Sequence, residues 1–111
     1  MTLEEVLAAL AAGEELDRTA LRDVVKELVR AFAADHPGRS VELRVPPYAA
    51  VQCVAGPRHT RGTPPNVVET DPLTWVQLCV GTVRWADAVA DGRVRASGER
   101  SDLSGFFTRM G

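Results

Sequence analysis

Cysteine is scarce in this sequence of 111 residues, where only Cys53 and Cys79 occur. Two cysteines are too few for a disulfide framework, and neither belongs to a CxxC pair or has histidines at zinc-ligand spacing. Both are therefore expected to be small buried hydrophobic side chains. Asp87 and Asp91 lie one helical turn apart without a third ligand, so neither a metal nor another cofactor is expected.

A strong excess of charge and a long apolar run are lacking as well. The chain has 13 basic and 15 acidic side chains, which give a formal charge of −2. It therefore lacks the excess of positive charge that proteins use to bind nucleic acid. The longest apolar run, Val6 to Ala12, is far short of a bilayer span, and the first charged residues are acidic. We expect a cytoplasmic protein with no nucleic-acid partner and no stable membrane insertion.

A catalytic constellation is also missing from the sequence. His59 could in principle activate Cys53, but no residue that would orient the histidine and no oxyanion site can be recognised. The other histidine, His36, falls at the end of a predicted helix, where it suits the local dipole. No catalytic residue is assigned, and we expect the protein not to be an enzyme.

The residues that are present predict one domain over residues 1–111. A hydrophobic content of 45% is enough for one ordinary core. Apolar residues at helical spacing predict a short helix before Gly13, and residues 1–16 are interpreted as an N-terminal helical extension. A second helix is predicted to start near residues 17–19 and to end at Pro37 and Gly38, with an apolar stripe that reaches Phe32.

Alternating apolar residues predict four short strands in the remainder of the chain. The first two, residues 41–45 and 49–54, are separated by Pro46-Pro47 and are expected to pair antiparallel. The third, residues 66–70, leads into a helix that either Thr70 or Asp71 can cap. A further helix over residues 84–91 precedes the fourth strand, near Val94. Residues 101–107 could form a short helix or run extended, with Phe106 or Phe107 packed on the sheet, a ligand or another subunit.

Residues 55–65 are predicted to form an exposed loop, because they contain two glycines and three prolines without apolar periodicity. Arg58, His59 and Arg61 lie within four positions of one another in this loop. The planar guanidinium groups of the two arginines could hold a carboxylate or phosphate. The alternative is an ordinary solvated basic loop.

The order of these elements resembles the sterol carrier protein family. The corresponding pieces are the strand over residues 66–70, the helices over 71–81 and 86–92, the strand over 93–98 and the apolar tail over 101–107. The stretch RVPPYAAVQCVAGPRHTRGTPPNVVETDP resembles the small bacterial sterol-carrier-like branch of the family. The resemblance implies an α+β fold, a mostly antiparallel twisted sheet of about five strands covered by helices, with a hydrophobic tunnel in members that bind lipids.

This resemblance implies non-enzymatic binding of a hydrophobic or amphiphilic small molecule, of the lipid, fatty acid or acyl-CoA type, in an interior cavity. A dry apolar lining supplies roughly 0.8 kcal/mol per buried methylene. The candidate lining residues are Trp75, Leu78, Cys79, Trp85, Val89, Phe106 and Phe107. If the same side chains fill the core instead, a protein-interaction module or homodimer is expected. Binding of a phosphorylated metabolite at the 55–65 loop is a third possibility.

Overall fold

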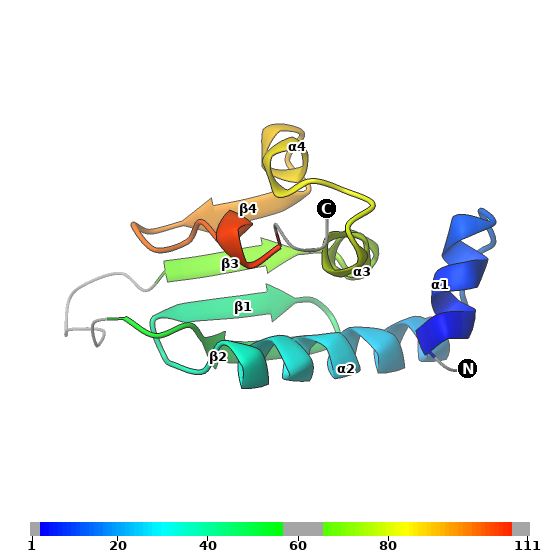
Figure 1. Ribbon diagram of the computed structural model, residues 1–111, viewed down its shortest axis with the longest axis horizontal. Helices are drawn as coiled ribbons and strands as arrows, with labels where there is room; N and C mark the ends of the chain where they lie inside the picture. Colours follow the sequence, from blue (N-terminus) through cyan, green and yellow to red (C-terminus); the bar gives the residue numbers. More distant parts are fainter. Residues whose placement is uncertain (1–2, 57–65, 108–111) are drawn as a thin grey trace.

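The computed structural model describes residues 3–56 and 66–107 of the chain (Figure 1). Two helices come first, followed by three strands, two further helices and a last strand. In chain order the elements are α1 (Leu3–Ala11), α2 (Arg18–Asp35), β1 (Val41–Val45), β2 (Ala49–Cys53), β3 (Asn66–Thr70), α3 (Pro72–Val80), α4 (Trp85–Ala90), β4 (Val94–Ser97) and the 3-10 turn η1 (Ser104–Phe106). The predicted α+β class and the predicted order of elements are confirmed.

The strands form one mixed sheet in the order β2-β1-β3-β4. β1 pairs antiparallel with β2, as predicted, and β3 pairs antiparallel with β4, whereas β1 and β3 are parallel. The described residues therefore hold four strands instead of about five. Residues 101–107 add no strand, because the Asp102 side chain accepts a hydrogen bond from the Ser104 amide (2.9 Å) and the Phe106 amide donates to the Leu103 carbonyl (3.0 Å). These bonds bend the segment into a tight turn.

One face of the sheet is buried and the other is open to solvent. Along β1, Val41, Leu43 and Val45 are fully buried, whereas Arg44 between them is exposed. The buried side chains belong to one hydrophobic core with side chains of α2 and α3, and Figure 1 shows α2 running alongside the sheet. The period of two along β1 thus places one row of side chains in the core and the other in water.

Local signals position the helices that cover this face. Asp17 caps α2, because its carboxylate accepts a hydrogen bond from the Ala20 amide at 2.8 Å. Asp71 caps α3 by accepting from the amide of Thr74 at 3.0 Å and from its hydroxyl at 2.6 Å. α3 ends at Gly81, whose φ of 82° is the left-handed conformation typical of a helix C-terminus. The Asp71 cap fixes the start of α3, the helix on which Trp75 is buried.

Candidate functional site

Phe107 lies in the core against aromatic rings from three helices. Its ring is nearly parallel to that of Phe32 on α2, with centroids 5.7 Å apart and an angle of 18° between the planes. It is also nearly parallel to the ring of Trp85 on α4, at 5.9 Å and 15°. Trp75 on α3 is perpendicular to it, at 5.9 Å and 83°. We call Phe32, Trp75 and Trp85 the aromatic walls around Phe107.

The segment that carries Phe107 is a single turn anchored by Leu103, which is fully buried in the core. The Phe107 amide donates to the Ser104 carbonyl at 3.1 Å, which closes a single turn. The preceding ring, Phe106, is half-buried and packs on α2, with its centroid 5.8 Å from that of Phe32 and 4.3 Å from that of His36. Ring contacts thus add to the burial of Leu103 in holding this turn against the core.

Trp75 is fully buried, and its indole nitrogen Nε1 has no hydrogen-bond partner among the described residues. Buried tryptophan N–H groups usually have an acceptor. A buried donor without one costs about 1–3 kcal/mol. The side chains of its ring neighbours Phe32 and Phe107 offer no oxygen or nitrogen acceptor. Within residues 3–56 and 66–107, the indole N–H of Trp75 is thus a buried donor without an acceptor.

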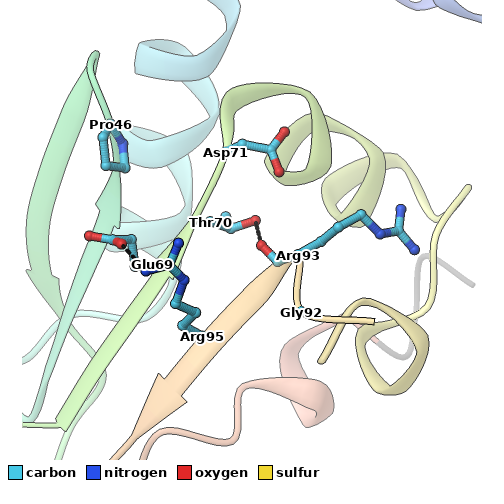
Figure 2. Close-up of a pocket in the computed structure, with 7 residues that line it drawn as sticks. All are labelled: Pro46, Glu69, Thr70, Asp71, Gly92, Arg93 and Arg95. Carbon is cyan, nitrogen blue, oxygen red and sulfur yellow. Dashed lines mark hydrogen bonds and ion pairs between the residues drawn. The ribbon is translucent and has the colours of Figure 1, made fainter. Parts of the chain in front are cut away.

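A surface groove of about 410 Å³, lined mainly by polar and charged residues, lies where β1 and β3 end (Figure 2). The Thr70 hydroxyl donates to the Arg93 carbonyl at 2.9 Å, and Figure 2 shows the Arg93 guanidinium directed away from Pro46. That guanidinium pairs with Asp91 at 2.8 Å, and Arg95 pairs with Glu69 at 3.8 Å. The basic groups of the groove already have acidic partners, so they are poorly disposed to bind an anion. The lining residues are Pro46, Glu69, Thr70, Asp71, Gly92, Arg93 and Arg95.

Comparison with known proteins identifies the family of this fold. A family model described as "bacterial SCP ortholog", where SCP denotes sterol carrier protein, matches residues 17–108. The chain belongs to the sterol carrier protein family. No curated protein matches it. Members of the family are generally non-enzymatic lipid carriers, so membership suggests a lipid carrier function for this chain.

The sterol carrier fold brings together most of the residues proposed to line a cavity. Trp75 and Leu78 are fully buried, Trp85 and Phe107 are nearly so, and Cys79 and Phe106 are half-buried at the edge of the core. Phe32 completes the cluster. The sequence predicts Phe32 as an aromatic side chain that could fill the core, on the apolar stripe of its helix, but not as one of the lining residues.

Val89 does not line the interior, contrary to the sequence-based assignment. Its side chain is 41% exposed, whereas Trp85 and Ala88 are the buried residues of α4. Trp85 and Ala88 are three residues apart, so they share the inward face of this short helix. The larger apolar side chain is therefore on the outer face.

The predicted anion site of this sterol carrier protein falls outside the residues that the structure describes. Arg58, His59 and Arg61 lie in residues 57–65, outside the described residues, so anion binding there stays a prediction.

Across residues 3–56 and 66–107, no three histidine, cysteine or acidic side chains are grouped as a metal site would require. No helix within those same ranges is long and apolar enough to cross a membrane.

Both thiols of this sterol carrier protein are expected to be unreactive in the folded state. Burial raises the pKa of Cys53 to about 11 and that of Cys79 to about 12. Because these pKa values lie well above 8, both thiols stay protonated at about pH 8. The thiolate, which is the reactive form, is therefore scarce. In the native protein, we expect both cysteines to react with a disulfide reagent at least about tenfold more slowly than in urea. Fast reaction of two thiols in the folded protein would contradict this.

Proposed function

We propose that this chain is a non-enzymatic carrier that binds a hydrophobic or amphiphilic small molecule between α2, α3 and α4. The observation that carries the proposal is Phe107, a single side chain on a one-turn segment that occupies the place where the aromatic walls converge. Family membership supports the same conclusion, since it suggests a lipid carrier. The ligand would take the place of Phe107.

Displacement of Phe107 is energetically reasonable. Aromatic pairs contribute about 0.5–1.5 kcal/mol each beyond the burial of their area. A ligand that packs against the same rings recovers these contacts, and it gains roughly 0.8 kcal/mol for every methylene that it buries. Opening the turn breaks the bond between the Phe107 amide and the Ser104 carbonyl, but leaves the sheet and α2 intact. The exchange therefore favours a sufficiently large apolar ligand.

The experiment is ligand detection followed by titration. Native mass spectrometry of the protein purified without detergent is expected to show a bound small molecule. After its removal, decanoic acid or 2-acetylnaphthalene is expected to shift the ¹H–¹⁵N indole signals of Trp75 and Trp85 saturably, because both rings contact Phe107. The Leu73→Ala protein, altered at an exposed side chain of α3, should respond as the wild type does. Absence of any bound molecule and of any saturable shift would contradict the proposal.

A protein-interaction module is the second candidate, and the filled space between the aromatic walls favours it. In that case Phe107 is a permanent part of the core, and partners would meet the open sheet face instead. On that face Arg44 and Glu69 lie in register on β1 and β3, with Arg95 next to Glu69 on β4. Light scattering that shows a concentration-dependent mass, together with no ligand binding, would support this alternative.

A further inference from the structure

The position that Phe107 occupies has the shape of a flat ring. Phe32 and Trp85 lie within 18° and 15° of the plane of the Phe107 ring, and Trp75 stands perpendicular to it. Near-parallel rings favour an occupant that is itself planar, because it can stack with offset faces on both neighbours. A flexible alkyl chain in the same place would leave part of these faces without contact.

The same position borders the ring that carries the unpartnered donor. Trp75 is in direct ring contact with Phe107, and its Nε1 has no partner among the described residues. The Phe107 side chain has no oxygen acceptor, whereas a small molecule in its place could have one. A site with a buried, unpaired polar group discriminates against ligands that leave the group unpaired. The occupant should therefore carry an acceptor on or next to its ring.

We propose that the ligand of this interior is an amphiphile with a planar unsaturated ring that bears an acceptor oxygen, such as an aromatic or quinone-type carbonyl. Its ring takes the place of Phe107 against Phe32 and Trp85, and Trp75 Nε1–H donates a hydrogen bond to its oxygen. This inference rests on the proposed function, because it specifies the class of ligand for the same interior. The rings select the planar shape, and the indole selects the acceptor.

The test compares three probes on the delipidated full chain. 2-Acetylnaphthalene has both a planar ring and an acceptor, 2-ethylnaphthalene has the ring without oxygen, and decanoic acid has oxygen without a ring. We expect 2-acetylnaphthalene to bind about tenfold more tightly than 2-ethylnaphthalene, the ratio that one net hydrogen bond supplies. 2-Acetylnaphthalene should move the indole N–H proton of Trp75 downfield, whereas 2-ethylnaphthalene, which has no acceptor, should not.

Two variants separate the roles of ring and donor. Trp75→Phe keeps an aromatic ring but removes the N–H, so the preference for 2-acetylnaphthalene over 2-ethylnaphthalene should fall to about twofold or less. Phe107→Ala removes the competing ring and should tighten the binding of both naphthalenes. The exposed variant Leu73→Ala should leave both affinities unchanged. The wild-type comparison of the two naphthalenes stands even if a variant fails to fold.

The outcomes distinguish this inference from the proposed function. If decanoic acid binds more tightly than 2-acetylnaphthalene, or if 2-ethylnaphthalene binds equally well, the chain is a carrier but the inferred ligand class is wrong. If the preference for the carbonyl survives in Trp75→Phe, the indole is not the donor, and the inference fails in that part. If no probe binds and no molecule is found with the purified protein, both the inference and the proposed function fail.

Discussion

Replacement of Gly38 by alanine is expected to lower the free energy of unfolding by roughly 3 kcal/mol or more. Gly38 has a φ of 149° in the turn between α2 and β1. A Cβ at this position would collide with the carbonyl of Val54 and with the amide nitrogen of Ala55. Backbone strain of about 1–3 kcal/mol adds to a steric cost of about 1–3 kcal/mol. The neighbour is backbone, so it has no alternative rotamer with which to relieve the clash.

The collision is costly because Val54 is fixed by other bonds. Its amide donates to the His36 carbonyl at 2.6 Å, and its carbonyl accepts from both the amide (3.1 Å) and the hydroxyl (2.8 Å) of Ser40. These bonds join the end of β2 to the turn after α2. Any shift of Val54 that makes room for a methyl group would therefore disturb the hydrogen bonds that align α2 with the sheet.

Gly13→Ala is the matched control, because Gly13 also has a positive φ, 76°, but a Cβ there would meet open space. It should cost about 1–2 kcal/mol, the strain of a left-handed residue alone. Chemical unfolding in urea, followed by far-ultraviolet circular dichroism, measures both variants. Equal costs at the two positions would show that the clash with Val54 is absent.

The sequence predicted those parts of the fold that local chemistry determines. Pro46-Pro47 separates β1 from β2, Asp71 caps α3 before Pro72, and Gly81 ends that helix, all within a few residues of the feature that they define. The family resemblance extended these local assignments to the sheet as a whole, and the family match over residues 17–108 confirms the family.

The features that the sequence did not predict depend on contacts between distant residues. The parallel pairing of β1 with β3 is set by the path of the chain between them, which no residue pattern within either strand encodes. Similarly, the contact between Phe32 and Phe107 joins α2 to the end of the described chain. Val89 was misassigned because α4 is too short for its periodicity to indicate which side faces inward.

Trp75→Ala is expected to have the other large effect, a loss of about 3–5 kcal/mol in the free energy of unfolding. Trp75 is the largest fully buried side chain in the described part of the chain, and its ring contacts those of Phe32 and Phe107 at centroid distances of 5.6 and 5.9 Å. Its removal leaves a cavity that these rings cannot fill without leaving their own contacts. Urea unfolding measures the loss, and Leu73→Ala, an exposed truncation two residues earlier, should cost less than about 1 kcal/mol.

The Trp75 variants also reveal what the unsatisfied indole costs the ligand-free protein. Trp75→Phe loses less ring volume than Trp75→Ala and removes the buried donor, whose unpaired state costs about 1–3 kcal/mol. Its destabilisation should therefore be less than half of that in Trp75→Ala. If both variants lose the same stability, the indole N–H has an acceptor in solution and the argument from an unpaired donor is wrong. A small loss in Trp75→Phe instead means that the wild-type chain retains a destabilising group, which a ligand with an acceptor oxygen would satisfy.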